Sequence, residues 1–306
     1  MTIRQRLRRA ATALAGLLLA APGLAQTAAP APTLKEVPPQ PLHPALWAVK
    51  DADTTIYLFG TIHALRPGMT WFNGPVAQAF GESSTLVTEI ADVGGSDVAQ
   101  ALLGNAMLPA GKSLRGMMNE ADRTAYDAAL QQAGIPLAAL DRFKPWYAAV
   151  VLSSLPLLRA GFKLEEGVEI QLAAKAKATA KSQEALETAA YQLGLFDSLP
   201  QPNQLAYLRQ VVDNLPQVTA QIDTIIGEWG KGDAKALADS MNAEENDAGL
   251  TEMLLTRRNK AWAQWIKARL EKPGTVFVAV GAGHLAGPGS VQDQLAAVGV
   301  GSTRVQ

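Results

Sequence analysis

The chain contains two Gly-x-x-His tetrapeptides, which end at His63 and His284, and each follows directly on an apolar run. These runs, residues 54–59 and 275–280, are rich in β-branched and aromatic residues, a pattern typical of strands buried on both faces. Open α/β sheets bind ligands at the carboxyl ends of their strands. We therefore expect the two histidines, from opposite ends of the chain, to meet at one site. The glycine that opens each motif is expected to let the backbone turn sharply.

Two imidazoles and one carboxylate can hold a catalytic metal ion with water in the open position. Glu89 is the candidate carboxylate, because it lies within the apolar run of residues 86–90, a setting that rarely contains glutamate. If Glu89 is buried it needs a cation, an arginine or a proton; otherwise it is a solvated residue on an edge strand. Metal ligands His63, Glu89 and His284 would suit manganese, cobalt, zinc or iron, and the metal would lower the pKa of a bound water.

Other common catalytic signatures are missing from the sequence. It has no His-x-x-x-His, no Gly-x-Ser-x-Gly, no Walker phosphate loop and no Gly-x-Gly-x-x-Gly turn. The formal net charge of −1 gives no reason to expect nucleic acid as a partner. Without cysteine, the chain cannot use a thiolate, a disulfide or a lipoprotein anchor.

The beginning of the chain is typical of an exported protein. Arginines in residues 4–9 precede an apolar run at 10–20, and small residues then lead to a predicted cleavage after Ala25. Residues 1–25 are therefore predicted to be a signal peptide, with an uncleaved anchor as the alternative, although the run is short for a membrane span. Residues 26–42 are rich in Ala and Pro and predict a linker. We expect a periplasmic or secreted protein without a stable membrane span after cleavage.

Residues 43–306 are predicted to form one α/β domain, in which strands from both ends of the chain build a mixed central sheet around a large inserted helical block. Residues 46–49 and 56–59 predict a hairpin, and residues 145–158 a buried helix. Residues 250–270 predict one long helix, from which Arg257, Arg258 and Asn259 can reach the site. The polar residues 181–185 predict only a weak strand before Glu187.

Taken together, these motifs resemble the TraB/GumN family, which includes bacterial TraB-like and GumN-like proteins, pheromone-shutdown proteins and the animal Tiki proteases. The resemblance extends from residue 43 to residue 300. It is carried by Leu46-Trp47 and by residues 56–63, 86–89, 144–146, 167–169, 186–188, 258–259 and 278–285.

This resemblance implies a fold related to the erythromycin esterases and the ChaN haem-binding group. It also implies a metal-dependent hydrolase acting on a peptide or protein. By resemblance, His63, His284 and Glu89 would bind the metal, Glu89 serving catalysis as well. Arg258 would support the site or stabilise an oxyanion. The resemblance also gives Glu187 and Glu169 roles as general base or as outer support. The alternatives are a periplasmic protein that binds haem or another small ligand, and a metal-free hydrolase with His63 as the base.

Overall fold

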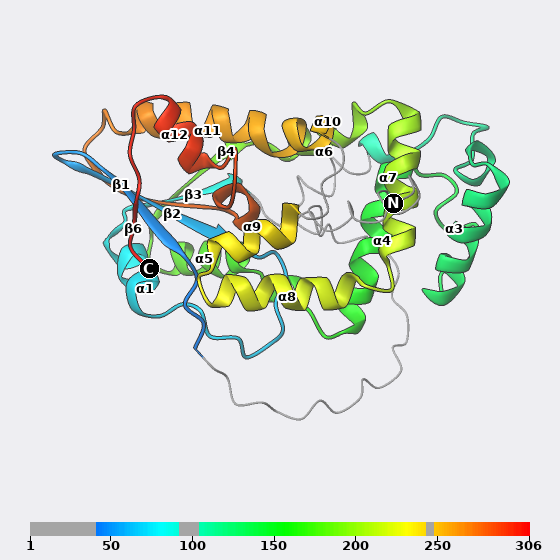
Figure 1. Ribbon diagram of the computed structural model, residues 1–306, viewed down its shortest axis with the longest axis horizontal. Helices are drawn as coiled ribbons and strands as arrows, with labels where there is room; N and C mark the ends of the chain where they lie inside the picture. The colour runs from blue at the N-terminus through cyan, green and yellow to red at the C-terminus, as the bar shows by residue number, and fades with distance from the viewer. Residues whose placement is uncertain (1–40, 92–103, 243–247) are drawn as a thin grey trace.

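The structure is a computed structural model that describes residues 41–91, 104–242 and 248–306 (Figure 1). The predicted signal peptide, residues 1–25, and all but the last two residues of the predicted linker, 26–42, lie outside this part. The division of the chain into these segments stays a prediction. Among the described residues, no helix combines the length and the apolar character needed to cross a bilayer.

Six strands form one mixed sheet in the order β4-β3-β5-β2-β1-β6. The neighbours from β4 to β2 run parallel, whereas β1 runs antiparallel to both β2 and β6. The hairpin of β1 and β2 and the α/β class with strands from both ends of the chain are therefore confirmed. The strands are β1 (Leu46–Lys50), β2 (Thr54–Thr61), β3 (Thr85–Ile90), β4 (Ser182–Glu187), β5 (Gly274–Gly281) and β6 (Thr303–Arg304).

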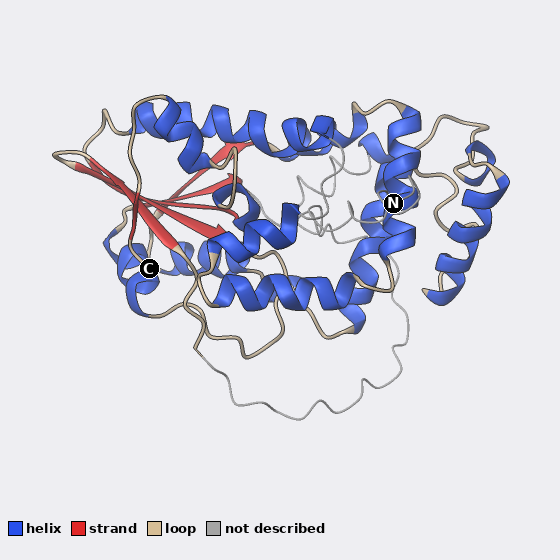
Figure 2. Cartoon of the chain, in the orientation of Figure 1, coloured by secondary structure: helices blue, strands red, loops and turns tan. Residues whose placement is uncertain are grey.

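Helices cover both faces of the sheet and form a block beyond its end (Figures 1 and 2). α11 and α12 cover one face, α1, α5 and α8 lie on the other, and α3, α4 and α7 stand in the distant block. The helices are α1 (Gly74–Glu82), α3 (Glu120–Gln132), α4 (Pro145–Arg159), α5 (Val168–Ala178), α6 (Ala189–Asp197), α7 (Gln201–Asn214), α8 (Val218–Gly230), α9 (Ala234–Asn242), α10 (Ala248–Thr251), α11 (Arg257–Arg269) and α12 (Val291–Ala297).

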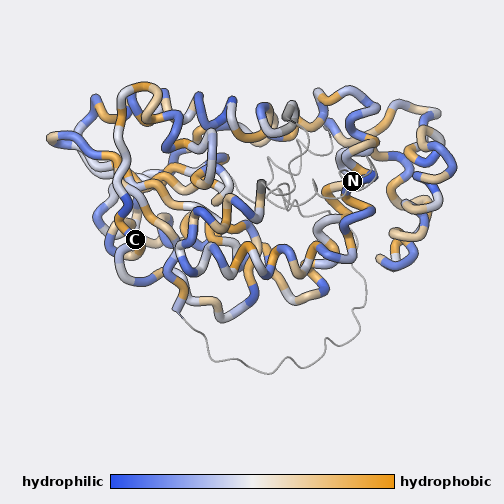
Figure 3. The backbone as a smooth tube through the Cα atoms, viewed as in Figure 1, coloured by the Kyte–Doolittle hydropathy of each residue, from blue (hydrophilic) through white to orange (hydrophobic). Residues whose placement is uncertain are grey.

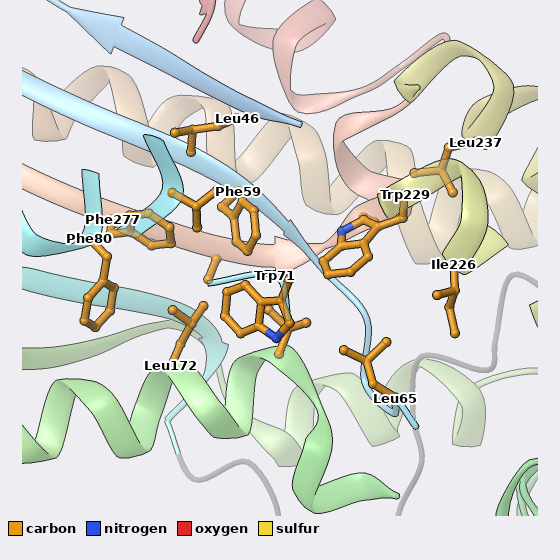
Figure 4. Close-up of a cluster of buried hydrophobic side chains, with 14 of the residues drawn as sticks. Leu46, Phe59, Leu65, Trp71, Phe80, Leu172, Ile226, Trp229, Leu237 and Phe277 are labelled. Carbon is orange, nitrogen blue, oxygen red and sulfur yellow. The ribbon is translucent and has the colours of Figure 1, made fainter. Parts of the chain in front are cut away.

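Alternation along β2 supplies both faces with apolar side chains. Leu58 packs with Trp262 of α11 on one face, whereas Phe59 joins Trp71 and Trp229 on the other (Figure 4). The Phe59 and Trp71 rings stack with centroids 5.6 Å apart. Because both faces are covered, the central strands carry mostly apolar side chains, and polar residues concentrate at the turns and outer helix faces (Figure 3).

The helical block has a separate core built around α4. The predicted buried helix is confirmed, since nearly all of α4 is buried, and Trp146 stacks against Phe196 of α6. Asp197, at the end of α6, accepts hydrogen bonds from Nε1 of Trp146 at 3.2 Å and from Lys144 at 2.5 Å. These contacts attach α6, and the strand β4 that precedes it, to the block.

One element differs from the sequence prediction, and one weakly predicted strand is present. The single helix predicted over residues 250–270 contains a π-helical turn, Glu252–Thr256, between α10 and α11. Such turns are frequent at functional sites because they change the direction of neighbouring groups. The polar segment before Glu187 does form a strand, β4, since it pairs with β3 along one side and leaves the other side at the sheet edge, where polar residues are tolerated.

Candidate active site

Four neighbouring parallel strands bring their carboxyl ends to one edge of the sheet. His63 follows β2, Glu89 lies near the end of β3, Glu187 closes β4, and His284 lies three residues beyond β5. In the sheet register, Ile90 pairs with Glu187. This is the edge at which parallel sheets place their ligands.

The three residues predicted to bind metal converge above Gly281. A β-carbon built at Gly281 would lie 3.2 Å from Oε1 of Glu89, 3.6 Å from Cδ2 of His284 and 3.8 Å from Nε2 of His63. We call this space the Gly281 recess. A side chain at residue 281 would crowd all three groups, which is why a glycine fits here.

The glycines of the two motifs allow neighbouring groups to approach the backbone closely. Neither lies in the left-handed region of backbone conformation. A β-carbon at Gly60 would stand 3.0 Å from the α-carbon of Ala282, so the first motif packs directly against the second. The carbonyl of Gly60 also accepts a hydrogen bond from Nε1 of Trp229 at 2.8 Å. The expectation of a turn is wrong for Gly60, which lies inside β2, whereas Gly281 ends β5 and a 3-10 helix, Ala282–Leu285, follows it directly.

His63 is oriented by Glu169, a buried residue in the first turn of α5. The carboxylate of Glu169 pairs with Nδ1 of His63, and since a carboxylate only accepts, Nδ1 carries the proton. Nε2 is then the nitrogen with a lone pair, and it is the atom that faces the Gly281 recess. Gly167 makes this pairing possible, because any side chain there would overlap the carbonyl oxygen of His63. The amide of Val168 binds the Ile62 carbonyl at 3.0 Å.

The pKa of His63 is lowered from 6.5 by burial, with Arg258 adding to the effect and Glu89 opposing it. The ring is nevertheless reachable, since about a quarter of the side chain (25%) is exposed. His63 is therefore a neutral base at pH 7 with access to solvent.

His284 is held through both ring nitrogens. Nδ1 lies 2.5 Å from Oδ1 of Asn259, and Nε2 lies 3.1 Å from Nη1 of Arg258. An arginine can only donate, so Nε2 accepts and Nδ1 donates to Asn259. Burial lowers the pKa of His284 to about 3, with Glu89 opposing the shift and Arg258 and His63 adding to it. The indole of Trp262 packs on the ring at a centroid distance of 4.4 Å. His284 is thus a fixed, neutral imidazole.

Arg258 uses all five of its N–H groups inside the protein. Nε binds Glu187 at 3.0 Å, and Nη2 binds Glu187 at 2.8 Å and Glu89 at 2.6 Å. Nη1 binds His284 and, at 2.9 Å, the carbonyl of Leu254 in the π-helical turn. Burial lowers the pKa of Arg258, but Glu89 and Glu187 outweigh it and raise the pKa above its ordinary value. With every donor engaged, this guanidinium supports its neighbours and has no N–H left for a substrate oxyanion.

Glu89 is a buried carboxylate whose charge is compensated by Arg258. Oε2 accepts from Nη2 of Arg258, and Oε1 accepts from the amide of Gly281 at 2.7 Å. Burial alone would raise the pKa of Glu89, but Arg258, both site histidines and the Gly281 amide hold it well below its usual range. The strand β3 lies between β4 and β5, so the alternative of a solvated edge residue is wrong.

Sequence reasoning missed two residues that complete this network. Nε2 of Gln192 binds Glu89 at 2.8 Å and Glu187 at 2.9 Å, and so joins the two carboxylates. Nε1 of Trp262 binds the second oxygen of Glu187 at 3.0 Å. A buried glutamine in the mostly apolar helix α6 is a signal that could have pointed to Gln192. Glu187 is left fully hydrogen-bonded, in a supporting position.

In their observed positions, the potential ligand atoms around the Gly281 recess do not fit a three-ligand metal centre. Nε2 of His63 and Oε1 of Glu89 face the recess, whereas Nε2 of His284 is hydrogen-bonded to Arg258. Within the described ranges, no group of three His, Asp or Glu side chains is placed to hold a metal ion. The divalent metal stays a prediction.

Comparison with known proteins gives a family and two relatives. The model of the TraB/PrgY/gumN family matches residues 45–304. The chain is 27% identical over 252 residues to the uncharacterized protein YbaP of Escherichia coli strain K12, a match that covers 82% of this chain and 92% of YbaP. It is 27% identical over 239 residues to the YbaP of Shigella flexneri, covering 78% and 87% of the two chains. No solved structure matches the chain.

Proposed function

The chain belongs to the TraB/PrgY/gumN family, and from this premise we propose that it is an exported hydrolase that cleaves a peptide or protein in the periplasm or outside the cell. The signal-like sequence of residues 1–25 supports export. The resemblance to the Tiki proteases supports a peptide substrate.

One observation carries the proposed reaction: Nε2 of His63 and Oε1 of Glu89 are two acceptors that face the same recess. A water molecule in the Gly281 recess would donate one hydrogen to each of them. Its remaining lone pairs would then be free to attack a substrate carbonyl. A neutral imidazole and an ionised carboxylate are both in the protonation states that this role needs at pH 7.

In the proposed reaction, the water oxygen bonds to the carbonyl carbon while Nε2 of His63 takes the water proton. The carbon–nitrogen bond then breaks, and the same proton passes from His63 to the leaving amine. Glu169 stabilises the imidazolium that forms in between, because its carboxylate lies on Nδ1 of that ring. His284 has no free ring nitrogen and Glu187 has no free oxygen, so neither serves as the base.

The proposal is tested by peptide hydrolysis with the protein purified from the periplasm. A peptide library is digested by the wild-type protein and the products are identified by mass spectrometry. We expect His63→Ala and Glu89→Gln to lower the rate about 100-fold or more, the usual size of a general-base contribution. His43→Ala is the matched control, since His43 lies before β1 and away from the recess. Absence of wild-type hydrolysis, or equal hydrolysis by His63→Ala, would overturn the proposal.

Repeating the peptide assay with a metal chelator distinguishes this reaction from the metal-dependent hydrolysis that the family resemblance implies. Hydrolysis that persists in excess chelator supports His63 as the base. Hydrolysis that is lost in chelator and restored by manganese or zinc overturns the role of His63 as the base and supports His63 as a metal ligand.

A further inference from the structure

We propose that the guanidinium of Arg258 is the permanent cation of this site and takes the place of a divalent metal between Glu89, Glu187 and His284. The inference concerns what the site binds rather than the reaction, and it is tested without any substrate.

Arg258 already occupies the atoms that a metal would need. It donates to Oε2 of Glu89 at 2.6 Å, to Nε2 of His284 at 3.1 Å and to both oxygens of Glu187. A neutral imidazole has one lone pair on this nitrogen. A metal at Nε2 of His284 would therefore have to displace Nη1 of Arg258.

Arg258 also has little freedom to move away from these atoms. Its side chain is only 6% exposed, its guanidinium carbon lies 4.8 Å from the ring centroid of Trp262, and its five donors are all engaged. Moving it would leave the carboxylates of Glu89 and Glu187 without their arginine partner, and an unpaired charge in such a position is strongly unfavourable. Gln192 and Trp262 hold those carboxylates in place from their other sides.

The hydrogen-bond network also holds the Arg258 guanidinium in one orientation. The carbonyl of Leu254, in the π-helical turn one turn before Arg258, accepts from Nη1 at 2.9 Å. This bond points the other N–H of Nη1 at His284, while Asn259, the next residue, takes the opposite nitrogen of the ring. Two consecutive residues of α11, Arg258 and Asn259, thus bind the two ring nitrogens of His284.

The proposal predicts that removing the guanidinium creates a metal site. Arg258→Ala would release Nε2 of His284 together with oxygens of Glu89 and Glu187. Imidazole nitrogen and carboxylate oxygen are donors that zinc and manganese accept, and the freed side chains would have to close around the ion, since no three of them are placed to hold one in the wild-type arrangement of the described residues. Arg258→Lys keeps a positive charge in the same place and should gain no metal.

The experiment is elemental analysis after incubation with excess zinc or manganese chloride and gel filtration. We expect wild type and Arg258→Lys to retain less than about 0.1 ion per chain, and Arg258→Ala to retain about 1, as for a formed protein site. The added substitution His284→Ala should remove the gained ion. A folded Arg258→Ala protein without metal would overturn the proposal.

The wild-type protein gives a second readout, which does not depend on the folding of a variant. In a zinc titration followed by ¹⁵N NMR, the signal of His284 Nε2 should remain that of a hydrogen-bonded acceptor. A shift of that nitrogen at one equivalent of zinc, or one retained ion per wild-type chain that His284→Ala removes, would overturn the proposal. Either result would leave the separate question of peptide hydrolysis to its own assay.

Discussion

Nη1 of Arg258 lies 3.1 Å from Nε2 of His284, whereas Nε2 of His63 faces the Gly281 recess. The two Gly-x-x-His motifs are therefore equivalent in sequence and unequal in chemistry. Both rings are neutral and both have a fixed tautomer, but Nε2 of His63 has no hydrogen-bond partner within the described residues, and the His63 side chain is 25% exposed against 6% for His284. His284 is instead held in one orientation beside Glu89 by hydrogen bonds to both of its ring nitrogens.

Glu169→Gln should lower kcat by about 10²- to 10⁴-fold and change KM little, since a neutral amide no longer stabilises the imidazolium of His63. The pH–rate profile should also change, because the pKa of His63 falls further when the carboxylate on Nδ1 is removed. Steady-state kinetics across pH 5 to 8 measures both effects. Glu165→Gln, at an exposed position four residues earlier, is the control and should behave as wild type.

Gly281→Ala should abolish hydrolysis while the protein stays folded. The added methyl group would stand in the recess, 3.2 Å from Oε1 of Glu89, and would exclude the attacking water. We expect a rate loss of about 100-fold or more, because the reacting groups no longer meet. Circular dichroism and a thermal melt check the fold. In Gly301→Ala, where nothing lies within 4 Å of the added atom, activity should be unchanged; full activity in Gly281→Ala would contradict the recess as the reaction site.

Gly167→Ala should destabilise the protein as well as slow the reaction. A methyl group at this position overlaps the carbonyl of His63 and pushes α5, with Glu169, away from the ring. Overpacking of this kind costs about 1–3 kcal/mol of unfolding free energy, which urea denaturation detects. Gly194→Ala, in α6 with open space around it, should not destabilise. A Gly167→Ala protein with wild-type stability and activity would show that Glu169 is positioned in another way.

As the pH is lowered, the protein should begin to lose stability at pH values well above those at which carboxylates titrate. The unfolded chain protonates His284 near pH 6.5 and the folded protein only near about 3, so unfolding is favoured as the pH falls through this window. Each such histidine contributes a slope of about 1.4 kcal/mol per pH unit. His63 acts in the same direction, and Glu89, whose pKa is lowered from 4.5, adds a loss below that pH.

Urea unfolding from pH 7.5 to 4 measures this dependence. His284→Gln removes one of the titrating groups, so its stability should fall less steeply between pH 6.5 and 4.5 than that of the wild type. A wild-type stability that stays constant from pH 7 to pH 5 would contradict a buried neutral His284.

The sequence by itself determined the strands and the edge at which their residues meet. Apolar β-branched runs identify β2 and β5 locally, and the side chains that follow parallel strands share one edge for topological reasons. The glutamate inside the apolar β3 run also indicated a buried charge in need of a partner. The family motifs pointed to Glu169, Glu187 and Arg258, without saying which of them touch.

Only the tertiary structure decided which of these residues contact one another and which ring nitrogen is left free. Arg258 meets Glu89 across 169 positions of the chain, and Gly281 meets Glu89 across 192. No local pattern encodes such contacts, because they depend on how the helices pack over the sheet. Hydrogen-bond partners in turn fix the tautomer and the free nitrogen of each ring. This is why two identical motifs yield one histidine that is locked by Arg258 and Asn259 and one, His63, that is free to accept a proton.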